Sequence, residues 1–256
     1  QPSSAGIETR ARAEMRLRHL FAALVIGAAV SAPAVTTNDA ATAEIQGRDL
    51  AQQLRDLQPP EGFTNSATLQ IRSKARRADV SLTALTSVTE TNWQTTYMAQ
   101  ATNGLAYLSV HHFTGRPNAY SFEPAVSDSE SARTHLMSPF ANSDFWVVDL
   151  ALEFLHWPGQ KVWRKELKKG QSCAVLESRP AEPATNGYSR VVSWVDIDTG
   201  GIVQAEAYDA KGKLLKEFEV KELEKINGRL EVTEIQMRNV QTGSRTTLHF
   251  NFTPAR

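Results

Sequence analysis

The chain has 256 residues, of which 41% are hydrophobic and 22% are charged, and its 28 basic and 28 acidic residues give no formal net charge. This length allows one or two domains with a substantial hydrophobic core. The balance of charge excludes the broad basic field on which nucleic-acid binding depends, so we expect no nucleic-acid partner.

The N-terminal residues have the layout of a secretory signal peptide. Residues 15–18 contain a methionine and two arginines, residues 20–30 are apolar, and small residues follow. As a helix, the apolar run would reach only about 16 Å, against about 30 Å for the hydrocarbon core of a bilayer, which disfavours a membrane span. We predict an over-extended N-terminus over residues 1–14, a signal peptide over 15–43 and a single periplasmic domain over 44–256, and we leave open an association with the outer membrane.

From residue 44 onward, the chain reads as one short helix followed by many strands. Residues 44–60 carry leucines and an isoleucine at helical spacing and end in two prolines, which predicts a short amphipathic helix. After it, the apolar period changes from about 3.6 to 2, which indicates strands. Asn103–Gly104 and Asn227–Gly228 are strong signals of hairpin turns.

The last hundred residues predict an antiparallel meander, because short apolar-alternating runs are separated by glycines. In RLEVTEIQMRN, residues 229–239, the apolar positions change parity, and a β-bulge near Thr233–Glu234 would repair this change. The elements predict a mainly β fold with a few helices. Bulges bend strands, so we expect the meander to curl into a barrel or half-barrel.

One stretch, SDFWVVDLALEFLHWP at residues 143–158, is unusually apolar for a chain of this composition. We predict that it forms a helix, on which Asp149, Glu153 and His156 lie in one narrow stripe. A carboxylate and an imidazole at this spacing can share a metal, but only with ligands from other helices, for which the sequence offers no matching motif. We therefore interpret the stripe as exposed to solvent.

The remaining surface of this predicted helix is apolar and must be covered. Two alternatives remain open: the helix fills a barrel-like core, or part of its surface lines a ligand site. The polar stretch at residues 124–137 is the most mobile segment that we expect, and we consider it and the helix as possible gates of such a site.

The sequence contains few signs of a catalytic site. It contains no glycine-rich phosphate loop and no H-E-x-x-H, G-x-S-x-G or C-x-x-C motif, so we expect no catalytic residues, no metal and no cofactor. His111 and His112 are adjacent in a predicted strand and should point to opposite faces. The single cysteine, Cys173, is interpreted as a buried inert thiol, with a reactive or intermolecular thiol as the alternative.

Several segments together resemble the outer-membrane lipoprotein-sorting proteins, relatives of the periplasmic lipoprotein carriers of the Lol system. They include SPFANSDFWVVDL, the order W-D-T-G followed by Y-D-x-K-G-K-x-x-K, and a final M-x-N-x-x-x-G-x-x-T-x-L run. The resemblance extends over residues 44–252. The present chain departs from the family around its SDF segment, which is more apolar here.

The resemblance implies a strongly curved antiparallel sheet, an unclosed half-barrel with helices on its concave side. Between the sheet and the helices it implies an apolar cavity that takes the acyl chains of lipoproteins, and it implies no catalytic residues. The residues that we expect to line such a cavity are Leu69, Ile71, Leu82, Trp93, Phe145, Trp146, Leu150, Phe154 and Leu155. The expected partners are an acylated lipoprotein or lipid and an envelope transporter or receptor, and the protein is expected to be a monomer.

Three functional hypotheses follow. The first is a periplasmic carrier that shields acyl chains in an apolar cavity. The second is a non-carrier envelope module, a partner subunit of a transport or export complex, which would show a collapsed core and an exposed apolar patch. The third, an enzyme acting on lipids or glycans, would need titratable groups converging in a cleft.

Overall fold

The structure is a computed structural model, and it describes residues 40–101, 104–123, 135–183, 185–226 and 229–251. Most of the predicted signal peptide, most of the expected loop over 124–137 and the turn residues Asn103 and 227–228 lie outside these ranges. Ala40–Ala43, which the prediction assigns to the signal peptide, form the first turn of a helix. No helix among the described residues combines the length and apolar character that crossing a membrane requires.

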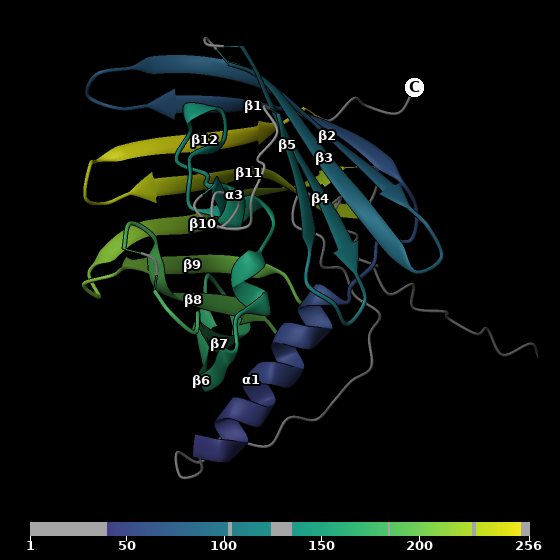
Figure 1. The fold of residues 1–256 in the computed structure, drawn as a ribbon, viewed down its shortest axis with the longest axis vertical. Coiled ribbons are helices and arrows are strands. Elements are labelled where there is room, and N and C mark those ends of the chain that lie inside the picture. Colours follow the sequence, from purple (N-terminus) through teal and green to yellow (C-terminus); the bar gives the residue numbers. More distant parts are fainter. Residues whose placement is uncertain (1–39, 102–103, 124–134, 184, 227–228, 252–256) are drawn as a thin grey trace, which may run out of the picture.

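The fold is mainly β, as predicted, and its elements alternate little between helix and strand (Figure 1). The strands are β1 (Phe63–Arg72), β2 (Arg77–Val88), β3 (Asn92–Ala101), β4 (Gly104–Phe113), β5 (Ala119–Glu123), β6 (Gly159–Lys168), β7 (Gln171–Arg179), β8 (Tyr188–Asp196), β9 (Ile202–Asp209), β10 (Leu214–Ile226), β11 (Arg229–Asn239) and β12 (Ser244–Phe250). The helical elements are α1 (Ala40–Arg55), η1 (Phe140–Asn142), α3 (Val147–Leu150) and η2 (Glu153–His156).

All strands belong to one 12-stranded antiparallel sheet in the order β5-β4-β3-β2-β1-β12-β11-β10-β9-β8-β7-β6. The N-terminal and C-terminal strands are therefore two meanders, joined where β1 pairs with β12. The predicted hairpins β3–β4 and β10–β11 are both present, because each pair is antiparallel and is joined by two residues. The strands β5 and β6 are the two edges of the sheet.

The alternating pattern of the sequence explains which face is buried. In β1 every second residue from Ala67 to Ile71 is buried, and so is every second residue from Val80 to Ala84 in β2. The register pairs Leu69 with Val80, so the apolar side chains of neighbouring strands lie opposite one another on the same face. This face carries the main core.

The predicted β-bulge is confirmed, and the structure adds a second one. Thr233 is an extra residue of β11, and Lys221 is an extra residue of β10 only a few positions away. The pairs Val220 with Ile235 and Leu223 with Val232 therefore keep the same register on both sides of the two bulges. The distortion is confined to this part of the two strands.

The prediction of a strongly curved half-barrel is wrong: the sheet is open, as predicted, but it is not strongly curled. Its strands instead change direction gradually, so that β3–β5 cross the direction of β8–β10 (Figure 1), as the normal right-handed twist of neighbouring strands predicts. The sequence pattern suggested one bulge with an uncompensated bend, whereas the paired bulges at Lys221 and Thr233 restore the register.

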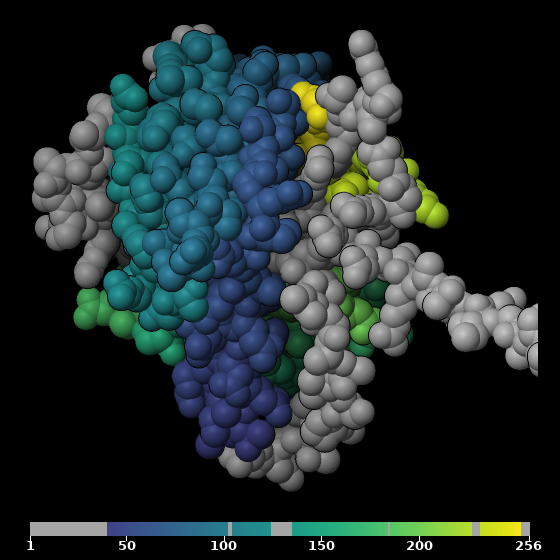
Figure 2. Space-filling view, turned by 90° about the vertical axis from the view of Figure 1, so that its right-hand side faces the viewer, coloured from purple at the N-terminus to yellow at the C-terminus, as the bar shows by residue number. Residues whose placement is uncertain are grey.

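The predicted N-terminal helix is confirmed as α1, which packs on the edge strand β6. Gly47 makes this close approach possible, because a Cβ atom built on it would lie 2.4 Å from the backbone nitrogen of Lys161. Ala51 and Leu54 are buried on the same helix. Figure 2 shows α1 (purple) continuing below the blue and teal strands on one side of the molecule.

A second, smaller apolar cluster lies on the other face of the sheet. It is formed by Cys173, Val175, Val192 and Trp194 from β7 and β8. Cys173 is fully buried there, which confirms the buried-thiol interpretation of the sequence.

Candidate functional site

Residues 138–157, which we call the plug, cover the core face of the sheet and form the centre of the candidate site. The prediction of one helix over 143–158 is wrong, because the plug contains only the short elements η1, α3 and η2. Ala141 and Asn142 within η1 and Leu152 just before η2 have positive φ angles of 52°, 56° and 48°. Such left-handed conformations interrupt a helix and are unfavourable for residues other than glycine.

Side chains from the rest of the fold bind backbone carbonyl groups of the plug. Tyr97 donates a hydrogen bond at 3.1 Å to the carbonyl of Leu150, which a continuous helix would use for its own hydrogen bond. Gln160 donates to the carbonyls of Phe154 and Trp157 at 2.9 and 2.8 Å, which would have no partner within a helix that ends here. These tertiary contacts hold the plug in its irregular form.

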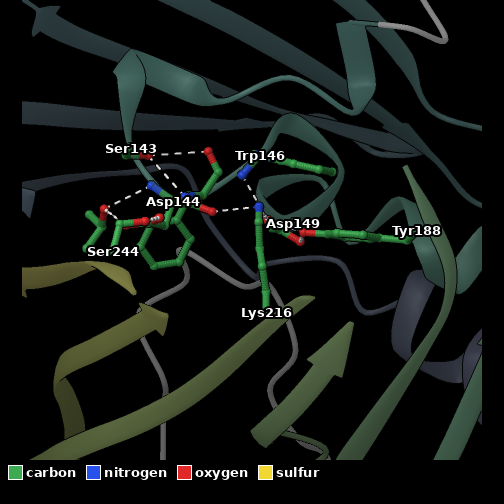
Figure 3. A network of polar contacts seen from close by, with 9 residues as sticks. Ser143, Asp144, Trp146, Asp149, Tyr188, Lys216 and Ser244 are labelled. Carbon is green, nitrogen blue, oxygen red and sulfur yellow. Dashed lines mark hydrogen bonds and ion pairs between the residues drawn. The ribbon is translucent and has the colours of Figure 1, made fainter. Parts of the chain in front are cut away.

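A buried lysine lies under the plug (Figure 3). Lys216 of β10 is only 1% exposed. Its ammonium group donates to the carbonyl of Asp144 at 2.7 Å and lies 3.3 Å from Oδ2 of Asp149. It also lies 3.7 Å from the centre of the Trp146 ring, a cation–π distance. The sheet thus places a positive charge against the plug.

Asp149 of α3 is buried and collects several donors. The hydroxyl of Tyr188 in β8 lies 3.0 and 3.1 Å from its two carboxylate oxygens. The backbone nitrogen of Trp146 donates to Oδ2 at 2.8 Å, which caps the start of α3. The rings of Trp146 and Tyr188 are stacked, with centroids 4.9 Å apart. Asp149 therefore joins the plug to β8 and β10 at one point.

Asp144 joins the plug to the centre of the sheet. Thr246 of β12 donates to Oδ2 of Asp144 at 2.8 Å and accepts from the backbone nitrogen of Asp144 at 2.9 Å. Ser244 of β12 donates to Oδ1 of the same carboxylate. We call the set Asp144, Asp149, Tyr188, Lys216 and Thr246 the anchor cluster.

The electrostatics of the anchor cluster follow from burial. Burial lowers the pKa of Lys216 to about 8, against the opposing effect of Asp149 and Asp144. At neutral pH the lysine is therefore still mainly charged and paired. Burial, followed by the charge of Asp149, raises the pKa of Tyr188 well above its ordinary value, so that Tyr188 remains a donor.

The predicted solvent-exposed stripe of Asp149, Glu153 and His156 is wrong. Asp149 is buried in the anchor cluster, whereas Glu153 and His156 are half-buried in η2. The three residues do not share one face because the helix that would align them is broken at Leu152. Among the described residues, no group of three or more histidine, cysteine, aspartate or glutamate side chains could hold a metal ion.

A second polar cluster binds the other end of the plug to the edge of the sheet. Glu153 accepts a hydrogen bond from the hydroxyl of Tyr120 and another from Asn118, the latter at 3.4 Å. Asn118 also bonds Nδ1 of His112 at 3.1 Å. Burial raises the pKa of Glu153 and lowers that of His112 to about 4. Burial therefore shifts both groups toward their neutral forms.

A pocket lies between the plug and strands β8–β11. Its empty volume is about 400 Å³, including the part that is open to solvent. The walls are mainly apolar and consist of Asp149, Leu152, Phe154, Val191, Ile202, Ala205, Ala207, Lys216, Phe218 and Met237. Asp149 and Lys216 of the anchor cluster therefore form the polar part of an otherwise apolar wall.

The structure distributes the predicted cavity residues over a wider area than this pocket. Phe154 lines it. The residues Leu69, Ile71, Leu82, Phe145, Leu150 and Leu155 are buried in the main core. Trp146 stacks on Tyr188, and Trp93 stacks on His112 with ring centroids 4.9 Å apart. Most of the space that the sequence suggested as a hollow is thus filled by the plug and the sheet.

The sequence analysis missed Lys216, although the sequence contained a signal for it. Leu214, Lys216, Phe218 and Val220 share one strand parity, and the other three are apolar. A lysine on the apolar face of a strand needs a buried partner. It is also the final lysine of the quoted Y-D-x-K-G-K-x-x-K pattern, and Asp144 is the aspartate of SDF.

Comparisons with known proteins agree with this architecture. A family model described as uncharacterized-protein-like matches residues 93–253. No curated protein matches the chain.

Three solved structures share the fold. A DUF1329 family protein from Desulfovibrio piger is 20% identical with a TM-score of 0.63, covering 82% of this chain and 91% of its own. An outer membrane lipoprotein-sorting protein domain from Vibrio parahaemolyticus is 20% identical with a TM-score of 0.65, covering 82% and 92%. A LolA superfamily protein from Nitrosomonas europaea is 17% identical with a TM-score of 0.54, covering 84% and 94%.

These structures confirm the resemblance that the sequence motifs indicated, as far as the fold is concerned. The chain therefore belongs to the uncharacterized-protein-like family whose model matches residues 93–253, and it has the fold of LolA-superfamily and outer membrane lipoprotein-sorting domains.

Proposed function

We propose that the protein is a periplasmic carrier that shields acyl chains of lipoproteins or lipids during outer-membrane sorting. The observation that carries this proposal is the apolar pocket between the plug and strands β8–β11. The fold supports it, because the similar Vibrio parahaemolyticus domain is described as a lipoprotein-sorting protein. The same likeness supports a location in the envelope.

The chemistry of the pocket fits a hydrocarbon better than a polar ligand. Asp149 and Lys216 are the polar residues of its wall, and they bind each other as well as Tyr188 and Trp146. A buried methylene gains about 0.8 kcal/mol over water, so a chain of about 15 methylenes would gain roughly 12 kcal/mol if it were fully buried. Because these polar groups are paired with one another, the pocket supports a binding role better than a catalytic one.

The pocket can enlarge at the plug. Its empty volume of about 400 Å³ includes space that is open to solvent, so the enclosed part is smaller than the roughly 300–1,000 Å³ that is usual for ligand sites. Leu152 forms part of its wall and has a left-handed backbone, which stores strain of about 1–3 kcal/mol. A rearrangement of residues 151–154 would release this strain and give a long acyl chain more room.

The proposal is tested by filling the pocket. Ala205 of β9 lines it, and a phenylalanine at this position would occupy the space that a ligand needs. We expect Ala205→Phe to reduce binding of a dansyl-labelled fatty acid at least tenfold. Ala119→Phe, at an exposed position of β5, should bind as the wild-type protein does.

Two further measurements complete this test. Thermal unfolding checks that Ala205→Phe folds, because overpacking commonly costs about 1–3 kcal/mol. Mass spectrometry of lipids extracted from gently purified protein should identify copurified acyl lipids. Equal probe binding by wild type and a folded Ala205→Phe variant, with no copurified lipid, would contradict the carrier function.

The filled part of the interior favours a second candidate, a non-carrier envelope module that docks to a transport or export complex. The plug buries Phe145, Val148 and Leu155 almost completely, as expected of a core and not of a ligand cavity. In that case the wild-type protein would bind no acyl probe and would instead copurify with an envelope partner after crosslinking.

A further inference from the structure

The zero net charge of the chain hides an uneven distribution of charge along the edge strand β6. Residues 161–169 contain five basic residues and one acidic residue, Glu166. The basic residues are Lys161, Arg164, Lys165, Lys168 and Lys169. The strand lies at the far end of the sheet beside α1 (Figure 1).

Acidic neighbours neutralise only part of this charge, because they pair with two of the five cations. Glu166 is held by Arg164 at 2.7 Å and by the indole nitrogen of Trp194. Glu219 of β10 pairs with Lys169. Lys161 and Lys165 make no ion pair with any residue that the structure describes, and they therefore remain available to an anionic partner.

Two large apolar side chains are exposed on the same strand. Trp163 is 41% exposed, and Leu167 is 78% exposed. Trp163 is the residue that a β-bulge inserts between Val162 and Arg164, so it has no partner in β7. Lys165 and Leu167 project from one face of the sheet. Lys161 precedes the bulge and lies opposite Glu177 in the register, so it projects from the other face, and the two rows flank the edge of β6.

Protection of a sheet edge explains only part of this composition. Lysines on an edge strand discourage pairing with another chain. An exposed tryptophan and an exposed leucine do the opposite, since they favour association. Tryptophan, leucine and lysine together are typical of surfaces that rest on a membrane, where the aromatic ring lies at the headgroup level and the cations meet anionic lipids.

We propose that the β6 strip, defined as Lys161, Trp163, Lys165 and Leu167, docks the protein on an anionic phospholipid surface. The cations bind headgroups, while Trp163 and Leu167 enter the interface. The strip lies outside the pocket, so this inference goes beyond the proposed carrier function and does not depend on it.

Cosedimentation with vesicles tests the proposal. Vesicles of phosphatidylglycerol and phosphatidylcholine should bind the protein, vesicles of phosphatidylcholine alone should bind it weakly, and added salt should release it. Each cation near an anionic surface contributes about fivefold, the equivalent of about 1 kcal/mol, so Lys161→Gln/Lys165→Gln should weaken binding about 25-fold. Trp163→Ser/Leu167→Ser should weaken it about tenfold or more.

Matched variants elsewhere on the surface control for charge and hydrophobicity. Lys211→Gln/Lys213→Gln removes two exposed cations of the turn before β10. Leu105→Ser removes a 53% exposed leucine of β4. Both should bind vesicles as the wild type does. The tryptophan fluorescence of wild-type protein should shift to the blue on anionic vesicles, and Trp163→Phe should abolish that shift.

Three results would overturn the proposal. The first is the absence of binding to anionic vesicles, and the second is equal binding to both vesicle types. The third is vesicle binding that the β6-strip variants leave unchanged while circular dichroism shows them folded. Binding of an acidic peptide to the strip without binding of vesicles would likewise replace the lipid surface with a protein partner.

Discussion

The buried charge of Lys216 allows a quantitative prediction of how much the anchor cluster contributes to the stability of the protein. Lys216→Met removes the cation but leaves the carboxylate of Asp149 buried, with Tyr188 and the backbone of Trp146 as its remaining donors. Removal of one partner of a buried ion pair typically costs about 3–5 kcal/mol, because the other charge stays uncompensated. We expect Lys216→Met to lower the free energy of unfolding by this amount.

The double variant Lys216→Met/Asp149→Asn provides the decisive comparison. It removes both charges, while an asparagine oxygen can still accept from the hydroxyl of Tyr188. Replacing a whole buried pair by neutral groups is often close to neutral. The carbonyl of Asp144 still loses its donor, at a cost of about 1–3 kcal/mol. The double variant should therefore be more stable than Lys216→Met alone.

Urea unfolding at pH 7 measures these differences, and a double-mutant cycle with Asp149→Asn isolates the interaction. Burial lowers the pKa of Lys216 to about 8 from an ordinary value of 10.5. Between these values the unfolded chain holds a proton that the folded chain has lost, so this group makes the free energy of unfolding rise with pH by up to about 3 kcal/mol. Lys216→Met should lack this rise. Additive effects in the cycle, or an identical pH dependence, would refute the reasoning.

Three other predictions address packing, pH and unsatisfied polar groups. Gly47→Ala should raise intrinsic helix propensity by about 1 kcal/mol yet destabilise the protein, because the new methyl group meets the backbone of β6; urea unfolding decides the sign. Burial lowers the pKa of His112 to about 4, so this group's contribution to stability falls as pH falls from 6.5 to 4, by up to about 3 kcal/mol. His112→Asn should flatten that part of the stability curve in thermal scans, whereas a variant His111→Asn that flattened it equally would contradict the assignment. Ser193→Ala should stabilise by about 1 kcal/mol, because the buried hydroxyl of Ser193 has no hydrogen-bond partner among the described residues. Ser178→Ala should destabilise, since Ser178 donates to Gln160 at 2.8 Å, and calorimetry of the two variants should show opposite changes in Tm.

The sheet could be predicted from the sequence because strand burial is a local pattern. Alternation along β1 and β2 and the change of parity near Thr233 each involve neighbouring residues, and the structure bears out both. The second bulge could not be predicted in the same way. Lys221 of β10 restores the register that Thr233 of β11 shifts, and the parity of one strand does not reveal this compensation.

The plug shows the opposite case, in which distant residues decide local structure. Its apolar run is equally compatible with a helix and with an irregular core segment. Groups that are distant in the sequence determine which of the two structures forms. Tyr97 binds the carbonyl of Leu150, and Lys216 binds Asp144 and Asp149. The site residues were therefore harder to predict than the strands that carry them.

The two polar clusters also determine which part of the plug can move. The anchor cluster holds α3 through a buried ion pair, and Tyr120 and Asn118 hold Glu153 at the other end. Releasing the whole plug would expose or break a buried ion pair, at several kcal/mol. Between the two clusters lies Leu152, whose left-handed backbone favours rearrangement. Under the proposed carrier function, an acyl chain that gains about 0.8 kcal/mol per buried methylene would displace this short segment once a few methylenes are buried, whereas opening at α3 would require many more.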